Sequence, residues 1–133
     1  MKAMLTLGAI AAMSITAPLA ADEPVAKGEA KLAKMLEGRV AGEPSRCVNT
    51  FRSGNLQIID DTAIVYRQGR TLWVNRTANP RGLDSDDYLV IRKFGSSSQL
   101  CRLDNVTTQD RTGNFFTGVV FLEDFVPYRA AEG

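Results

Sequence analysis

The sequence contains no histidine and only two cysteines among its 133 residues. A chain without histidine cannot build a Ser-His-Asp triad or a Cys-His dyad, and it lacks the commonest ligand of zinc, copper and haem sites. A glycine-rich phosphate loop is missing too, because no glycine run is followed by the Lys-Ser/Thr pair that binds phosphates. These absences predict a protein that holds no cofactor and is not an enzyme of these classes.

The chain also has no excess of either charge. It carries 16 basic and 15 acidic residues, for a formal net charge of +1. A nucleic-acid-binding domain needs a basic face to meet the phosphates. The balance therefore argues against a nucleic-acid partner.

The N-terminal segment is rich in alanine and uncharged between Lys2 and Asp22. A basic residue, an apolar run and a proline near its end (Pro18) are typical of a signal peptide. A run of roughly 17 apolar residues could also cross a bilayer, but the threonine, serine and proline residues inside this one favour a signal. We expect cleavage after Ala21 or Ala20, which removes residues 1–21 and leaves a periplasmic or secreted protein without a transmembrane segment.

Cys47 and Cys101 remain in the exported chain. In an oxidising compartment, two cysteines predict one disulfide. It would close a loop of about 55 residues, which contributes roughly 4 kcal/mol in the chain-entropy model. The alternative is a redox pair, which usually has a Cys-x-x-Cys spacing that is absent here. With both thiols bonded, thiolate catalysis and thiolate metal ligation are excluded as well.

Residues 22–46 are predicted to form an amphipathic helix and its connection. Leu32, Met35, Leu36 and Val40 recur at helical spacing, with lysines on the other face. Glycine and proline residues end the pattern. We expect the helix to pack on the domain; the alternative, a helix on a membrane surface, needs a larger apolar face.

The next segment changes to strands, and residues 55–76 predict a three-strand meander. Asp60-Asp61 and Gln68-Gly69 are each interpreted as a two-residue hairpin turn. The resulting register pairs Leu56 with Val65 and gives the meander one wholly apolar face. That face consists of Leu56, Ile58, Ala63, Val65, Leu72 and Val74.

The opposite face of the meander is mixed, so we expect the helix or a later strand to cover part of it. It carries Tyr66 and Trp73, while Arg67 and Arg70 face each other across the second turn. Two arginines there could bind an anion, but a solvated hairpin tip is the simpler interpretation. Because Trp, Tyr and Arg dominate interface energetics, Tyr66, Arg70 and Trp73 form the candidate binding face, with ordinary sheet packing as the alternative.

The remaining sequence predicts further short strands. Residues 77–87 form a loop rich in Pro, Gly and Asp, YLVIRKF is a strand, QLCRLDNVTTQD holds one or two strands, and FFTGVVFLEDF is the most apolar strand. Gly118 suggests a bulge in the last of these. We therefore predict a mainly β fold, with a small antiparallel sheet of six to seven short strands curled into a roll or barrel and one N-terminal helix. The disulfide-stapled β domain covers residues 47–129, and residues 130–133 form a tail.

Carboxylates remain as candidate catalytic or metal-binding groups, since a glycosidase needs only two acids. Each also has a structural interpretation. Asp suits a turn because it tolerates positive φ, the LDSDDY motif lacks the glycine and closing glutamate of a calcium loop, and Asp104 can accept backbone N–H groups beside the disulfide. We favour the structural interpretation throughout. The candidates are Asp60, Asp61, Asp84, Asp86, Asp87, Asp104, Glu123 and Asp124.

Four segments together resemble a group of known proteins: LEGRVAGEPSRC, IIDDTAIVYRQGRTLWVNR, SQLCRLDNV and GVVFLEDFVPYR. The group consists of small exported two-cysteine β proteins of alphaproteobacteria, typical of the sphingomonads, and the resemblance covers Lys31 to Arg129. It implies a Gram-negative, periplasmic setting. No activity and no site residue comes with it.

The sequence thus predicts a non-enzymatic periplasmic or envelope protein that acts through contacts with a protein or another component of the envelope. Two alternatives stay open. A curved sheet could carry a small molecule, and a pair of carboxylates could hydrolyse envelope glycans.

Overall fold

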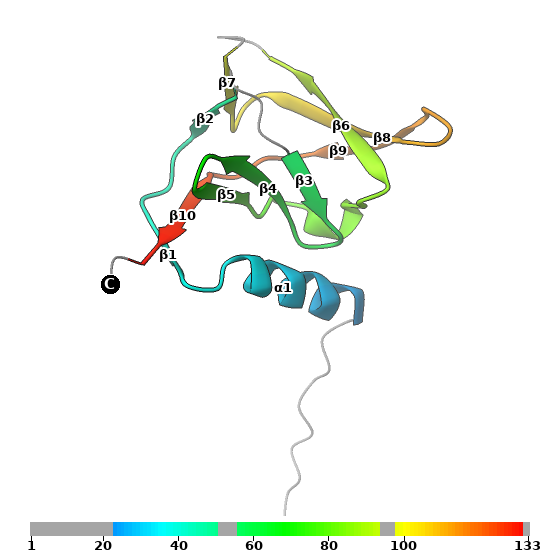
Figure 1. Cartoon of the computed structure of the whole chain (residues 1–133). Coiled ribbons are helices and arrows are strands. Elements are labelled where there is room, and N and C mark those ends of the chain that lie inside the picture. Colours follow the sequence, from blue (N-terminus) through cyan, green and yellow to red (C-terminus); the bar gives the residue numbers. More distant parts are fainter. Residues whose placement is uncertain (1–22, 51–55, 94–97, 132–133) are drawn as a thin grey trace, which may run out of the picture.

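The computed structural model of the chain describes residues 23–50, 56–93 and 98–131. These residues form three layers (Figure 1). A helix packs on one face of a five-stranded antiparallel sheet, and two smaller antiparallel sheets cover the other face. The predicted mainly β fold with one N-terminal helix is confirmed. The prediction of one curled sheet of six to seven strands is wrong, because the described residues form three sheets, none of them closed or strongly curled.

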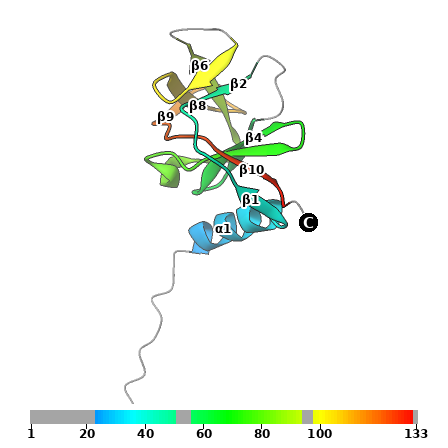
Figure 2. The ribbon, with the colours of Figure 1, turned by 90° about the vertical axis from the view of Figure 1, so that its left-hand side faces the viewer.

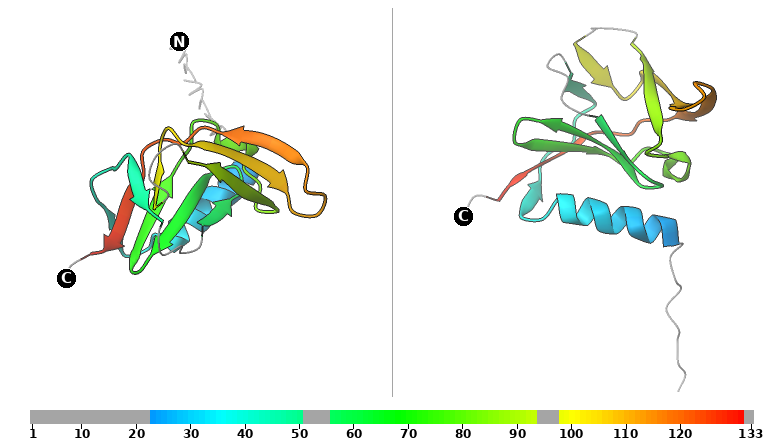
Figure 3. Two further views of the ribbon diagram at one scale, coloured as in Figure 1. Left: turned by 90° about the horizontal axis from the view of Figure 1, so that it is seen from above. Right: turned by 45° about the vertical axis from the view of Figure 1, so that its right-hand side comes forward.

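The helix α1 spans Glu23–Met35. The central sheet has the order β1-β10-β5-β4-β3, made of β1 (Arg39–Ala41), β10 (Val126–Ala130), β5 (Thr71–Asn75), β4 (Ala63–Gln68) and β3 (Leu56–Ile59). The second sheet joins β6 (Asp87–Arg92), β8 (Asn105–Asp110) and β9 (Phe116–Val120), and the third pairs β2 (Cys47–Asn49) with β7 (Gln99–Cys101). A 3-10 turn, η1 (Pro80–Gly82), precedes β6. Figure 2 shows β1 beside β10 above the helix, and Figure 3 shows the β8–β9 hairpin projecting from the body.

The amphipathic helix forms as predicted, but it ends at Met35. Leu32 is buried, and Met35 and Leu36 pack against the same cluster of the central sheet. Gly38 takes φ +70°, which turns the chain into β1. Val40 therefore lies in an edge strand and is 58% exposed. Its predicted place on the apolar face of the helix is wrong.

Gly28 lets α1 approach the turn between β3 and β4. It is buried, and a Cβ at this position would lie 1.8 Å from Thr62 Oγ1 and 2.4 Å from the Asp60 carbonyl oxygen. The Thr62 hydroxyl donates a hydrogen bond to that same carbonyl at 2.8 Å, so it is not free to move aside. A residue that lowers helix propensity is thus the one that permits close packing of the helix on the sheet.

The first hairpin has a register one residue away from the predicted one. Its loop holds Asp60, Asp61 and Thr62 rather than the two aspartates alone. Asp61 takes φ +52°, a conformation that Asp tolerates because its short polar side chain can bond locally. The shift of one residue moves the side chains of Leu56 and Ile58 to the face opposite the predicted one.

The second hairpin differs from its prediction by two residues. Its two-residue loop is Gly69-Arg70, and Gly69 takes φ +57°. Val65 therefore pairs with Val74 and not with Leu72. A register shift of two residues leaves each side chain on its predicted face. The apolar residues of β4 and β5 therefore still share the faces that the sequence predicted.

Strand β4 is buried on both faces from Ala63 to Tyr66. On the helix side, Ala63 and Val65 join a cluster that includes Leu32 of α1. On the other side, Ile64 and Tyr66 join a cluster supplied by the two smaller sheets and the chain around them. Its further buried members are Val48, Ile58, Leu83, Leu100, Val106, Val120, Leu122 and Phe125. The expectation that a later strand covers the mixed face of the meander is confirmed.

Asn75 joins the end of β5 to the segment between β9 and β10. Its side chain is fully buried, at 0% exposure. Its Nδ2 donates to the Glu123 carbonyl at 2.6 Å, and its Oδ1 accepts the N–H groups of Glu123 and Thr77 at 3.0 Å each. One amide thus satisfies three backbone groups and fixes the end of β5 against the chain that returns from the second sheet to β10.

The later strands follow the predicted pattern. The segment QLCRLDNVTTQD forms two strands, β7 and β8. The bulge suggested by Gly118 is present, because Thr108 pairs with Gly118 while Gln109 pairs with Phe116. Thr117 is the extra residue of the bulge.

We expect Gly28→Ala to lower the free energy of unfolding by about 1–3 kcal/mol, because the added methyl group overpacks the contact with the β3–β4 turn. Helix propensity alone would raise that free energy by about 1 kcal/mol. The sign of the measured change therefore shows whether overpacking or helix propensity dominates. Chemical denaturation measures it. Gly82→Ala is the control, since no described atom lies within 4 Å of a Cβ there. A stabilised Gly28→Ala variant would contradict the packing argument.

We expect Asn75→Ala to lower the free energy of unfolding by about 2–4 kcal/mol, because it leaves several buried backbone groups without a partner. Asn105→Ala on the exposed start of β8 is the matched control and should change it by less than about 1 kcal/mol. Urea titration of both variants makes the comparison. Equal losses for the two would show that the Asn75 amide does not bridge the layers.

Candidate functional site

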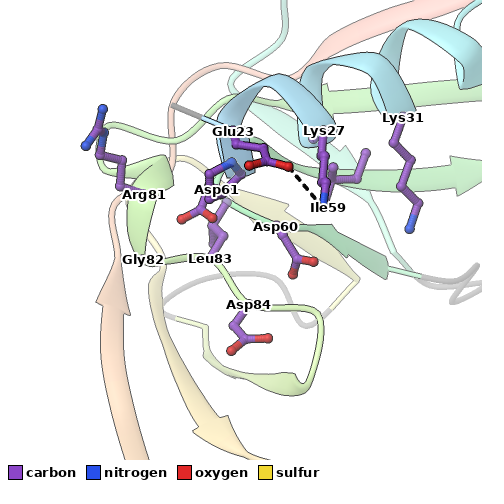
Figure 4. Close-up of a pocket in the computed structure, with 12 residues that line it drawn as sticks. Glu23, Lys27, Lys31, Ile59, Asp60, Asp61, Arg81, Gly82, Leu83 and Asp84 are labelled. Carbon is purple, nitrogen blue, oxygen red and sulfur yellow. Dashed lines mark ion pairs between the residues drawn. The ribbon is translucent and has the colours of Figure 1, made fainter. Parts of the chain in front are cut away.

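A cleft of about 650 Å³ lies between the start of α1, the β3–β4 turn and the segment after η1 (Figure 4). Both signs of charge line it. The charged residues are Glu23, Lys27, Lys31, Asp60, Asp61, Arg81 and Asp84. Lys27 and Glu23 pair with each other at 3.8 Å, but their side chains are 78% and 83% exposed. Such pairs are solvated and contribute little, and neither sign of charge dominates the lining.

The aspartates of this cleft hold the loops that form it. Asp60 Oδ1 accepts the Ser85 N–H at 2.6 Å, and Asp84 Oδ1 accepts the Asp86 N–H at 2.9 Å. The first bond attaches the loop after η1 to the β3–β4 turn. Asp60 and Asp61 therefore lie in a turn, as predicted, although the turn is one residue longer.

The LDSDDY motif is likewise used by the fold. Asp87 is only 6% exposed, and its Oδ2 accepts the Thr117 hydroxyl at 2.8 Å. This bond ties β6 to the bulge of β9. Across the described ranges, no group of three His, Cys, Asp or Glu residues is placed to hold a metal ion.

The candidate binding face inferred from the sequence is only partly at the surface. Tyr66 is 1% exposed, and its hydroxyl donates to a backbone carbonyl of β2 at 3.0 Å, so it belongs to the core. Trp73 is half-buried; its Nε1 donates to a β4 side chain at 2.9 Å, and Arg129 lies 5.9 Å from its ring centroid. Arg70 is exposed in the hairpin turn, where its carbonyl accepts a hydrogen bond from an arginine of β1. It does not face Arg67, which pairs with Leu72.

An exposed apolar surface lies elsewhere, on β9 and the turn before β8. Six large apolar side chains of the described residues are exposed, and five of them lie here. We call these five the β9 surface. They are Leu103 (86% exposed), Phe115 (60%), Phe116 (61%), Val119 (42%) and Phe121 (61%). Exposed apolar patches of this kind mark interaction sites.

The strand register explains which side chains of β9 face outward. Val120 of β9 pairs with Val106 of β8, and both are buried in the core. The next pair, Val119 and Thr107, points to the other face because successive side chains alternate. Phe121 shares that outer face with Val119.

A groove of about 320 Å³ runs along the C-terminal half of β9. Residues 102–106 and residues 119–122 line it, so Leu103 and Phe121 both border the groove. Phe116 begins β9 and Phe115 comes directly before it, at the end where the hairpin projects (Figure 1). The β9 surface thus has a projecting aromatic end and a grooved end.

Asn79 closes part of the free edge of β9. Its Nδ2 donates to the Val119 carbonyl at 2.8 Å, and its Oδ1 accepts the Phe121 N–H at 3.1 Å. The neighbouring Ala78 N–H donates to the Phe121 carbonyl at 2.8 Å. These bonds occupy the backbone groups that an added strand would use. The outward face of β9, and not this part of its edge, is therefore open to contact.

The turn that presents Leu103 is fixed at its start. The predicted disulfide between Cys47 and Cys101 is present and joins β2 to β7. Asp104 Oδ2 accepts the Cys101 N–H at 2.8 Å, so the predicted structural role of Asp104 beside the disulfide is confirmed. Leu103 is thereby held on a short, closed turn.

Ion pairs link the same turn to the segment after β9. Arg102 pairs with Glu123 at 3.1 Å and with Asp124 at 3.3 Å. All three side chains are about two-fifths exposed, so each pair contributes little alone. Together they keep the two sides of the groove together.

Comparisons of the chain with protein-family models, with curated proteins and with solved structures find no match. Within the described ranges, no helix has the length and apolar character needed to span a bilayer. The predicted signal peptide, residues 1–21, lies outside these ranges.

We expect replacement of both Cys47 and Cys101 by alanine to lower the free energy of unfolding by roughly 4 kcal/mol, because the 54-residue separation no longer restricts the unfolded chain. Denaturation of the wild type with and without reductant, beside the double variant, measures this loss. The reduced wild type should match the variant. Equal midpoints in all three samples would contradict a stabilising disulfide.

Proposed function

We propose that this protein is a non-enzymatic binding protein of the cell envelope and that it holds a protein partner on the β9 surface. The observation that carries the proposal is the concentration there of five of the six exposed large apolar side chains of the described residues. Apolar area left in water costs about 25 cal/mol per Å². A partner that covers these side chains recovers that free energy.

The construction of the surface supports this function. Strand β9 is bonded to β8 on one side and to Asn79 on the other, and the disulfide fixes the turn of Leu103. A backbone that is already fixed loses little conformational entropy on binding, so more of the contact energy contributes to affinity. Aromatic anchors surrounded by polar groups are typical of interface centres.

The envelope setting rests on separate observations. Disulfides persist in oxidising compartments such as the periplasm and the extracellular space, and this chain has one. The first 21 residues have the composition of a signal peptide. Both favour export from the cytoplasm.

The two alternative functions have weaker support. A small-ligand carrier was expected to use a concave sheet, whereas the described sheets are not strongly curled, and the cleft at α1 has a mixed, solvated lining. A carboxylate enzyme needs acids that are free to act on a substrate. Asp60, Asp84, Asp87 and Asp104 instead accept hydrogen bonds that hold turns and strands.

We expect cross-linking in intact cells to couple the protein to one recurrent partner, and the double variant Phe116→Ser/Phe121→Ser to lose most of that product. Both side chains are about 60% exposed, so the fold should keep its stability to within about 1–2 kcal/mol. Mass spectrometry of the cross-linked products gives the readout. Thermal unfolding confirms that the variant is folded.

Val40→Ser is the matched control, because Val40 is also exposed, at 58%, but lies in β1, away from the β8–β9 hairpin (Figure 1). It should leave the product unchanged. A product that survives the β9 double variant, or that Val40→Ser removes equally, would exclude the β9 surface as the binding site.

A further inference from the structure

We propose that the partner on the β9 surface is a second copy of this chain, packed face to face about a two-fold axis near Val119. This inference rests on the proposed function, since both need the β9 surface to be an interface. It goes further by naming the partner and the contacts.

The first argument is that the β9 surface is complementary to itself. Its two ends differ: Phe116 is exposed at the hairpin end, and the groove lined by Leu103 and Phe121 lies at the other end. A two-fold axis across the strand places the hairpin end of each copy over the grooved end of the other. Each Phe116 then enters the groove of its partner, and the same contact occurs twice, as a two-fold interface requires.

The second argument is the area of the surface. A large aromatic side chain buries about 150–250 Å² when fully covered. At about 60% exposure, Phe116 and Phe121 together present roughly 200–300 Å², and Leu103 and Val119 add to this. Phe115 is not counted, because successive side chains of a strand point to opposite faces. A stable interface buries roughly 800 Å² on each partner. The apolar side chains therefore supply a large share of that area, and the polar residues around the groove supply the remainder.

The third argument is charge. The five side chains of the β9 surface are uncharged, and Arg102 beside the groove is already paired with Glu123 and Asp124 within the chain. The whole sequence has a formal net charge of only +1. Two copies therefore meet without net repulsion, and a net charge near zero favours self-association.

The fourth argument concerns the mode of contact. Asn79 occupies the edge groups of Val119 and Phe121, so two copies do not join these strands edge to edge into an extended sheet. Packing of two antiparallel sheets face to face, about 10 Å apart, uses the outward side chains instead. Such packing about a two-fold axis is closed, so it ends at two chains.

The experiment uses the purified protein in the form that cells accumulate. Sedimentation equilibrium from roughly 1 to 100 μM should show a dimer for the wild type and for Val40→Ser. Phe116→Ser and Leu103→Asp should each raise the dimer Kd roughly a hundred-fold or more. Each substitution is present in both copies, so it damages both of the symmetric contacts between Phe116 and the groove. Circular dichroism and thermal unfolding show whether each variant keeps the fold.

A mixture of the two variants distinguishes the loss of a contact from the loss of the fold, because unfolded variants cannot restore a dimer when mixed. Phe116→Ser keeps an intact groove, and Leu103→Asp keeps an intact phenylalanine. A mixed pair therefore retains one of the two contacts, whereas neither variant alone retains any. The mixture should sediment with a larger dimer fraction than either variant at the same total concentration.

The outcomes separate this inference from the function on which it rests. A wild type that stays monomeric to 100 μM, or a dimer that both variants leave intact, overturns the two-fold packing proposed here. If the wild type is monomeric and Phe116→Ser/Phe121→Ser still abolishes cross-linking to a different protein in cells, the binding function stands and the partner is that protein. If neither a dimer nor a cross-linked partner depends on these side chains, both proposals fail.

Discussion

The burial of β4 on both faces requires two covering layers, and the rest of the chain supplies them. Ala63 and Val65 face the helix, while Ile64 and Tyr66 face the smaller sheets. A sheet exposed on one side would need polar residues at every second position, and this strand has none from Ala63 to Tyr66. The helix must therefore approach closely on one side, which Gly28 permits. The chain after β5 must cross to the other side and build the second sheet there.

Two asparagines fix that crossing. The side-chain amide of Asn75, at the end of β5, forms hydrogen bonds with the backbone of Glu123. The side-chain amide of Asn79 forms hydrogen bonds with the backbone of Val119 and Phe121. Between them Thr77 takes φ +48°, and its buried Oγ1 has no hydrogen-bond partner in the described residues. A β-branched residue in this conformation costs roughly 1–2 kcal/mol. The bonds on either side hold the chain there, so the strain is a consequence of joining two layers at a short crossing.

The alternation of apolar residues and the turn residues predicted much of this fold. The helix, the presence of the meander, the bulge at Gly118 and the position of Asp104 all follow from local patterns, whereas the sequence left open whether residues 99–110 form one strand or two. The register of the first hairpin does not. Ile58 and Ile59 are adjacent and both buried, so either face of β3 satisfies the pattern, and Asp60, Asp61 and Thr62 all suit a loop. Contacts with residues distant in sequence hold the longer turn: Thr62 lies against Gly28. Asp60 accepts the Ser85 N–H, and the Asp61 N–H donates to the Leu83 carbonyl.

The candidate site was harder to predict for the same reason. The sequence of its own hairpin predicts that Tyr66 is exposed, but the smaller sheets bury it. The opposite holds for FFTGVVFLEDF, the most apolar strand, because its side chains at Phe116, Val119 and Phe121 are exposed to solvent. Composition alone cannot separate a strand buried on two faces from a strand buried on one.

The exposed side chains of β9 are not needed to form the strand. Only its inward residue Val120 is buried in the core, and the outward position of the neighbouring strand is filled by Thr107, which pairs with Val119. Threonine is as good a strand former as valine or phenylalanine, so polar residues would serve the fold equally well on this face. Large apolar side chains there leave area in water that the folded monomer does not recover. Their presence is therefore best accounted for by a contact outside the monomer, on the one face of the second sheet that the core does not use.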